Sequence, residues 1–136
     1  MGLVRTEITL KNASDAFLAR QGQIETEHIR QATVNALVDT GSWALVINEE
    51  LRERLGLDIL GPASGTLANG TSGLYNRAGP VEIIWKDRGF MFEALVLPDA
   101  KNVLLGALPL EGLDLIVNPL KEEVVGAHGD EVVHFL

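Results

Sequence analysis

Apolar and polar residues alternate near the start of the chain. In the segment 3–10, LVRTEITL, the side chains of Val4, Thr6, Ile8 and Leu10 share one face, which is the period of a half-buried β-strand. Comparable apolar runs, bounded by turn residues, recur along the rest of the chain. They predict further strands at 32–39, 43–47, 79–85, 90–97, 102–106, 113–119 and 131–135.

Helical signals are few and short. The segment 48–57, NEELRERLGL, predicts a helix that begins after Asn48 as its N-cap and ends at Gly56 as a left-handed residue. Residues 107–112 predict a short helix or a turn, and the polar segment 12–31 is irregular, with room for one helical turn. Many short strands with one or two short helices predict an all-β fold, a closed or folded-over β-barrel, as a single domain over residues 1–136.

Two turns join neighbouring strands in this pattern. Asn69 and Gly70 form the strongest short signal for a two-residue hairpin turn. The polar residues 86–89 predict the turn between the strands at 79–85 and 90–97. Gly65 and Gly73 flank the first hairpin and are candidate hinges.

Composition removes several classes of function. The chain has 136 residues, is 46% hydrophobic and carries a formal net charge of −8, so its surface repels a phosphate backbone and nucleic acid is not an expected partner. It has no cysteine, which removes disulfides and thiolate chemistry and fits a reducing, cytoplasmic location. No apolar run approaches the roughly 20 residues that span a bilayer, and the first residues lack the pattern of a signal peptide, so no membrane partner is expected.

An acidic residue closes one of the most apolar strands. Asp39 follows the run from Val34 to Val38 and is itself followed by Thr40 and Gly41. A buried carboxylate without a partner costs several kcal/mol, so Asp39 either sits in a solvated turn or is held at low dielectric for a purpose. Gly41 permits a turn that a Cβ would resist, and the Thr40 hydroxyl is available to bond a backbone group nearby or on another chain.

Three stretches in a fixed order resemble the single-domain aspartic proteases of the retroviral type, the retropepsins, and especially their small bacterial relatives. The first is ALVDTGSWALVINEELRERLGL at 36–57, an apolar strand, Asp-Thr-Gly-Ser, a second strand and a short helix. The second is the hairpin signal LANGT at 67–71, about 30 residues after Asp39. The third is VLLGALPLEGLDLIVNP at 103–119, and the likeness spans roughly residues 33–119.

The resemblance implies specific roles for residues in these stretches. Asp39 is the implied catalytic residue of an aspartic endopeptidase, supported by Thr40, Gly41 and Ser42. The hydroxyl of Ser42 is placed to donate to the Asp39 carboxylate. The implied flap over the substrate consists of Leu67, Ala68, Asn69, Gly70 and Thr71, and the implied apolar-glycine motif consists of Leu104, Leu105 and Gly106. The substrate would be a polypeptide, and neither a metal ion nor a cofactor is implied.

Hydrolysis by carboxylates requires two of them, one ionised and one protonated. The chain has one Asp-Thr-Gly and no Asp-Ser-Gly, so the resemblance implies a homodimer in which Asp39 meets Asp39 of a second copy. Two carboxyls about 3 Å apart cannot both be ionised, and the pair would hold one proton. The strand expected at 131–135 is available to pair in a dimer sheet.

Other interpretations of the same residues remain. The fold could serve as a catalytically silent dimerisation or peptide-binding module that keeps Asp-Thr-Gly for its turn. The glycine-rich stretch at 61–73 lacks the ending of a phosphate loop, and Ser42 lacks the surroundings of a hydrolase nucleophile. The histidines and their acidic neighbour fit no zinc spacing, and both tryptophans are expected in the core. These residues are His28, His128, His134 and Asp130, with Trp43 and Trp85.

Overall fold

The computed structural model describes residues 3–67 and 69–134. Its helical elements are α1 (Ala13–Arg20), the 3₁₀ turn η1 (Thr26–His28), α2 (Glu49–Leu55) and α3 (Ala107–Gly112). Its strands are β1 (Arg5–Asn12), β2 (Gln31–Val38), β3 (Leu45–Ile47), β4 (Asp58–Thr66), β5 (Ser72–Trp85), β6 (Arg88–Val96), β7 (Leu104–Leu105), β8 (Leu115–Asn118) and β9 (Glu123–Gly126). Within the described ranges, no helix has the length and apolarity needed to cross a bilayer.

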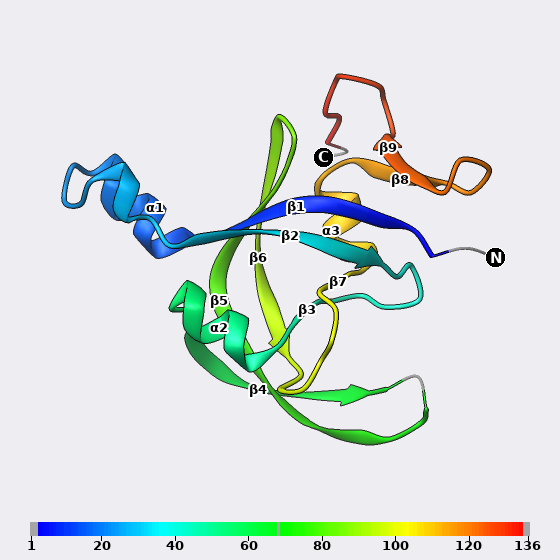
Figure 1. Ribbon diagram of the computed structural model, residues 1–136, viewed down its shortest axis with the longest axis horizontal. Helices are drawn as coiled ribbons and strands as arrows, with labels where there is room; N and C mark the ends of the chain where they lie inside the picture. Colours follow the sequence, from blue (N-terminus) through cyan, green and yellow to red (C-terminus); the bar gives the residue numbers. More distant parts are fainter. Residues whose placement is uncertain (1–2, 68, 135–136) are drawn as a thin grey trace.

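The main sheet closes on itself. Its strands follow the order β1-β2-β7-β3-β6-β5-β4, and a further pairing of β1 with β5 completes the ring (Figure 1). Most neighbours are antiparallel, but β2 runs parallel to β7 and β3 runs parallel to β6. The expectation of an all-β, closed or folded-over barrel is confirmed. A separate pair, β8 and β9, lies beside α3 near the C-terminal end of the chain.

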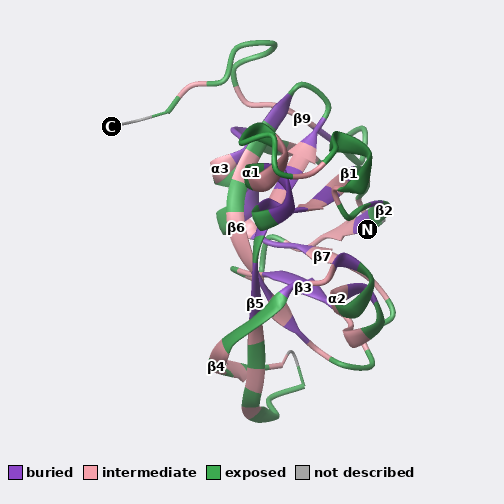
Figure 2. Cartoon of the chain, turned by 90° about the vertical axis from the view of Figure 1, so that its left-hand side faces the viewer, coloured by how far each residue is buried: buried purple, intermediate pink, exposed green. Residues whose placement is uncertain are grey.

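The core is formed by alternate residues of the barrel strands, which point inward as the period of two requires. Ile8 and Leu10 of β1, Ile83 of β5 and Leu105 of β7 are almost fully enclosed. Figure 2 shows buried stretches of the chain, in purple, along β3 and β5. Trp85 is also in the core, with its indole nitrogen donating to the Thr6 hydroxyl at 2.8 Å. The core position expected for Trp43 is wrong, because 68% of that residue is exposed.

Helix α2 has the ends that the sequence predicts. The Asn48 side chain accepts a hydrogen bond from the backbone N–H of Leu51 at 2.8 Å, and Gly56 ends the helix with φ of 62°. Leu51 and Leu55 are its buried residues. Local capping chemistry therefore sets both ends of this helix, and two buried leucines attach it to the barrel.

The segment after β1 has more regular secondary structure than its polar sequence suggests. Residues expected to be irregular form the two-turn helix α1, whose N-cap Asn12 accepts from the N–H of Asp15 at 2.9 Å. The same Asn12 side chain donates to the carbonyl of Leu55, and Asp15 receives three hydrogen bonds from Arg30. The bonds to Leu55 and from Arg30 join positions 43 and 15 apart in the sequence, so the pattern of apolar residues alone could not reveal them.

Two further differences concern strands. The stretch 58–66 contains two glycines and a proline and carries no strand signal, yet it pairs with β5 along its length as β4. The strand expected at 131–135 is absent from its described residues, 131–134, where Glu131 makes only an isolated bridge to His128; Phe135 lies outside the described residues. The earlier Glu-Val-Val, at 123–125, pairs with β8 instead, because the turn after Asn118 folds it back onto that strand.

The end of α3 is tied to the C-terminal segment. Asp114 lies next to the histidine ring, with Oδ2 2.8 Å from Nδ1 of His128, and it accepts from the backbone N–H of Val133 at 3.0 Å. Arg88, expected in a polar turn, is instead buried at the start of β6 and donates to the carbonyls of Leu113, Asp114 and Gly129. These bonds hold residues 127–133 against the end of α3.

This arrangement predicts a pH dependence of stability. The hydrogen bond from His128, and next the one from the Val133 N–H, hold the pKa of Asp114 below its usual range. A lowered pKa means that ionised Asp114 stabilises the fold above the ordinary pKa of about 4, and that this contribution is lost as the pH falls through the lowered value. In urea unfolding from pH 7 to pH 3, we expect Asp114→Asn to lie furthest below wild type at pH 7, with the difference shrinking on acidification. The control is Asp99→Asn, which removes an exposed carboxylate away from this segment. A difference between Asp114→Asn and wild type that stays constant from pH 7 to pH 3 would contradict this role of Asp114.

Candidate active site

Asp39 directly follows the last residue of β2, at the point where that strand meets β7. Its backbone N–H donates to the carbonyl of Leu105 at 3.0 Å, and the preceding residue, Val38, pairs with Leu105 in the parallel ladder. In the single chain the residue is half-buried. The main chain of Asp39 is therefore fixed by the barrel, while its side chain lies at the boundary between the core and solvent.

The loop after Asp39 is closed by hydrogen bonds to Asp39 itself. The N–H of Gly41 donates to Oδ1 of Asp39 at 3.0 Å, and the N–H of Ser42 donates to the Asp39 carbonyl at 3.1 Å. A Cβ at Gly41 would lie 3.3 Å from the same Oδ1. The backbone here is not left-handed, so a Cβ would conflict only with the carboxylate, which would have to shift by a few tenths of an ångström.

The apolar-glycine motif packs against this loop and is hydrogen-bonded to it. Leu104 and Leu105 form β7, which lies between β2 and β3 and pairs with both. The N–H of Gly106 donates to the carbonyl of Ala44 at 2.9 Å, and the N–H of Ala107 donates to the carbonyl of Ser42 at 2.6 Å. The motif and the Asp-Thr-Gly loop, distant in the sequence, are thus one hydrogen-bonded unit.

Gly106 leaves no room for a side chain. A Cβ at this position would lie 2.4 Å from the carbonyl oxygen of Ala44 and 2.5 Å from that of Ser42. Real Cβ atoms do not approach backbone atoms so closely. The glycine therefore allows the two backbone segments to touch, which a larger residue would prevent.

The remaining loop residues differ in exposure and partners. Thr40 is exposed, and in the described part of the single chain its hydroxyl makes no hydrogen bond. The Ser42 hydroxyl accepts from the N–H of Ala44 at 3.3 Å and, within the described residues, does not donate to the Asp39 carboxylate as expected. In the isolated chain Ser42 therefore shapes the loop.

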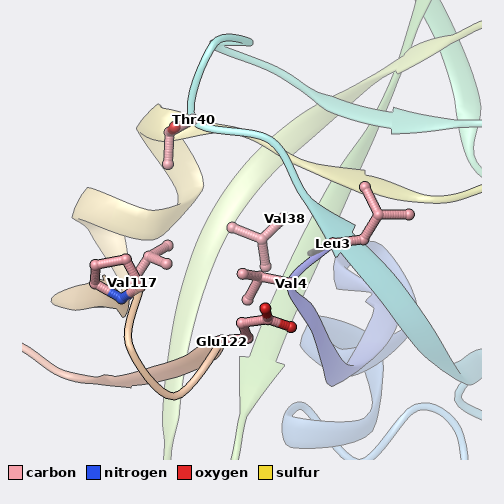
Figure 3. A pocket seen from close by; sticks show the side chains of 7 residues that line it. Leu3, Val4, Val38, Thr40, Val117 and Glu122 are labelled. Atoms are coloured by element: carbon pink, nitrogen blue, oxygen red, sulfur yellow. The ribbon is translucent and has the colours of Figure 1, made fainter. Parts of the chain in front are cut away.

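An apolar cavity of about 250 Å³ adjoins Thr40. It lies between the end of β2, the start of the described chain and the β8–β9 hairpin (Figure 3). Its lining residues are Leu3, Val4, Val38, Thr40, Val117, Pro119 and Glu122. One chain contributes a single acidic residue to the loop, Asp39, and leaves this apolar surface open beside it.

The β4–β5 hairpin extends to the same side of the barrel as the Asp-Thr-Gly loop in Figure 1. Its ladder continues to Thr66 and Ser72, whose hydroxyls lie 3.0 Å apart, and then to the bond from the N–H of Leu67 to the carbonyl of Thr71 at 2.8 Å. The pairing thus ends at Leu67 and Thr71, and Gly70 has φ of 85°, so the two-residue turn expected at Asn69-Gly70 is wrong. Ala68 lies outside the described residues.

The tip has little support beyond its own backbone. The side chain of Asn69 accepts from the N–H of Thr71 at 2.9 Å, which closes the loop locally. Leu74, on the strand that leaves the tip, is 74% exposed. The hairpin is thus held by its ladder more than by packed side chains.

The position of Trp43, next to the loop, is not predicted by the sequence pattern. The alternation of apolar residues predicts a core position for Trp43, which follows Ser42, yet its ring is on the surface beside Leu108. The short strand β3 begins only at Leu45, two residues later than expected. Because Trp43 precedes the ladder, the alternation of the strand does not apply to it.

Comparisons with known proteins agree with this geometry. A sequence model described as aspartyl protease matches residues 26–108, which is more than half of the chain and includes both the Asp39 loop and the apolar-glycine motif. The crystal structure of the retroviral protease-like domain of Ddi1 from Leishmania major has a TM-score of 0.58 at 16% sequence identity, covering 97% of this chain and 91% of that one. At this identity the structural likeness concerns the fold. A comparison with curated proteins finds no match.

Proposed function

The chain belongs to the aspartyl protease family, and on that premise we propose that it is an aspartic endopeptidase whose catalytic pair is Asp39 of two copies. The observation that carries the proposal is the loop itself, in which a single carboxylate is fixed by the barrel at the boundary of the core. We also propose that residues 1–136 act as one retropepsin-like domain. The substrate is an extended polypeptide.

The proposed chemistry divides the work between the two carboxyls. The ionised Asp39 takes a proton from water while the water oxygen bonds to the carbonyl carbon of the peptide, and the protonated Asp39 gives its proton to the carbonyl oxygen. As the tetrahedral species breaks its C–N bond, the Asp39 that took the proton from water gives it to the leaving nitrogen, and the other Asp39 takes a proton from one of the two hydroxyls. A carboxylic acid and an amine leave, and the pair again holds one proton.

A twofold arrangement accounts for features that one chain leaves incomplete. It would supply the second carboxylate, bring a partner to the unbonded Thr40 hydroxyl, and cover the apolar cavity beside Thr40. Asp39, half-buried in the single chain, would then lie at low dielectric. Gly41 and Ser42 hold the turn that presents it.

The alternative is a catalytically silent dimerisation or peptide-binding module. One observation favours it: Oδ1 of Asp39 accepts from the N–H of Gly41 at 3.0 Å, so the aspartate also serves the turn. The two functions are separated by incubating the protein with a reduced, unfolded protein between pH 3 and pH 7.5 and identifying new termini by mass spectrometry. An endopeptidase produces internal cleavages that a peptide-based transition-state analogue suppresses, and a module produces none. Sedimentation in the same buffers should show a dimer.

We further propose that the β4–β5 hairpin closes over bound peptide, with residues 67 and 69–71 at its tip; Ala68 lies outside the described residues. Because the tip is held by its ladder and by few packed side chains, its amides should exchange rapidly in the free protein. Addition of the transition-state analogue should slow exchange over residues 65–75, while α1, which lies at the other end of the barrel in Figure 1, stays unchanged. If the protein is active but its hairpin amides exchange at the same rate with and without the analogue, the proposed closure of the hairpin is contradicted.

A further inference from the structure

An exposed tryptophan stands beside the candidate catalytic loop. Trp43 is 68% exposed, and large aromatic side chains are usually kept at least partly from water unless they contact a ligand or partner. Its backbone is nevertheless fixed, because the N–H of Leu108 donates to the Trp43 carbonyl at 3.3 Å. The residues on both sides, Ser42 and Ala44, are bonded to Ala107 and Gly106. Trp43 thus keeps a set position relative to Asp39 while its ring faces solvent.

Trp43 lines a cavity of about 210 Å³ between the loop and the strand that leads to the hairpin tip. One wall is the loop and α3, and the opposite wall comes from β4, β5 and β6. The lining residues are Trp43, Ala44, Ala63, Ser64, Arg77, Phe92, Glu93, Ala94, Leu95 and Leu108. A cavity of about 150 Å³ with apolar walls admits a benzene ring, so this one is large enough for a single apolar side chain.

The charges of the lining cancel. Nη1 of Arg77 lies 2.7 Å from Oε2 of Glu93, and both side chains belong to the same wall. The other members are apolar except Ser64. A paired Arg77 and Glu93 leave no net charge to attract an ionic group, and the surfaces of Trp43, Phe92 and Leu108 favour an apolar one.

We propose that this cavity is a subsite for an apolar side chain, preferentially aromatic, of the peptide bound across Asp39, and that Trp43 determines that specificity. The inference rests on the proposed function, since it assumes a peptide at Asp39. The lining does not include Asp39, Thr40 or Gly41, so the side chain it receives is outside the two residues that flank the cleaved bond. Because β4 forms the opposite wall and continues to the hairpin tip, closing of the hairpin would narrow the cavity around its occupant.

Cleavage-site mapping tests the proposal. The probe is a library of acetylated decapeptides divided into pools. In each pool one position is fixed as phenylalanine, and a matched pool has alanine fixed at the same position. For wild type, one position outside the cleaved pair should show higher kcat/KM with phenylalanine, and Trp43→Ala should reduce that preference by about tenfold or more. Trp43→Phe should retain most of it. Phe17→Ala removes another exposed aromatic, 53% exposed on α1, and should leave it unchanged.

Two results would overturn the subsite. The first is an unchanged phenylalanine preference in a Trp43→Ala protein that still cleaves. The second is dissociation of the dimer by Trp43→Ala in sedimentation, which would place the ring at the interface between copies instead.

Fluorescence separates this proposal from the protease itself. The chain has two tryptophans, and in Asp39→Asn combined with Trp85→Phe, Trp43 is the one tryptophan that remains, so emission excited at the red edge of tryptophan absorption comes from it. A phenylalanine pool should shift this emission to shorter wavelength more than its alanine pool, because the occupant displaces water from the ring. If the variant shows this shift but the wild-type protein cleaves no pool, the endopeptidase proposal is wrong and the subsite proposal stands. If the wild-type protein cleaves the pools but the emission of the variant shifts equally with all of them, the endopeptidase proposal stands and the subsite proposal is wrong.

Discussion

Replacing Asp39 with asparagine is expected to lower kcat/KM for any cleaved peptide by about 10³-fold or more, without unfolding the protein. Positioned proton transfer alone contributes about 10²–10⁴-fold, and the dyad loses both its base and its acid. The side-chain oxygen of the new asparagine would still accept from the N–H of Gly41, so the turn should survive. The measurement is steady-state cleavage, with thermal unfolding to verify the fold. Asp87→Asn, which removes a carboxylate that is 70% exposed in another turn, should retain activity.

Mixing the two proteins tests whether the pair is shared between copies. If each active site needs Asp39 from both chains, a threefold excess of Asp39→Asn leaves about one dimer in sixteen with two carboxylates. Activity per wild-type chain should then fall to about a quarter of its value alone, once subunits have exchanged. Activity that depends only on the amount of wild-type chain, in proteins shown to exchange, would contradict the shared dyad. An active Asp39→Asn protein would contradict the catalytic role altogether.

Gly106→Ala is expected to have the largest effect on stability, about 3 kcal/mol or more. The reason is steric: φ is −88°, which any residue adopts, but a Cβ would overlap the backbone of Ser42 and Ala44 at 2.4–2.5 Å. Ser42 and Ala44 lie in the loop between β2 and β3, and hydrogen bonds from Ala107 and Gly106 fix their carbonyls, which therefore cannot rotate away as a side chain can. The loop that carries Asp39 must therefore separate from β7, so activity should be lost even in the fraction of molecules that stays folded.

The free energy of unfolding of Gly106→Ala is measured by urea unfolding. Cleavage is assayed at urea concentrations well below the midpoint of that transition. The matched control is Gly89→Ala in the β5–β6 hairpin. There a Cβ meets Oε2 of Glu82 at 3.3 Å, the mobile end of a side chain, so the effect should stay within about 0.5 kcal/mol. Equal stability of the two variants would show that the contact between Gly106 and the Asp39 loop is not needed.

Much of the site could be predicted from the sequence because its signals are local. The order of Asp39-Thr40-Gly41, a hairpin and Leu104-Leu105-Gly106 is written in short stretches of the chain. Both caps of α2 are local as well, because the Asn48 side chain accepts from the N–H of Leu51 and the backbone N–H of Gly56 donates to carbonyls of the same helix. The sequence also predicts the closed β fold, since alternating apolar runs have few other ways to bury their inner faces.

Only the tertiary structure shows which of two similar segments forms a strand and where an apolar residue points. Both 123–125 and 131–133 read Glu-Val-Val, but only the first is carried onto β8 by its turn. Trp43 looks like a strand residue in the alternation, yet it lies before the ladder, and bonds from residues 106–108 hold the loop around it. Arg88 looks like a turn residue, yet carbonyls brought from the end of α3 and from Gly129 surround it.

The sequence by itself thus determined the family, the position of Asp39 and the helix ends, because each depends on neighbours along the chain. The tertiary structure decided that Gly106 supports the Asp39 loop, that Trp43 borders a cavity, and that Asp114 holds the C-terminal segment. These depend on pairs of residues between 14 and 65 positions apart. Bringing such pairs together is favoured by burial of the whole barrel core, so no single stretch of sequence carries the information.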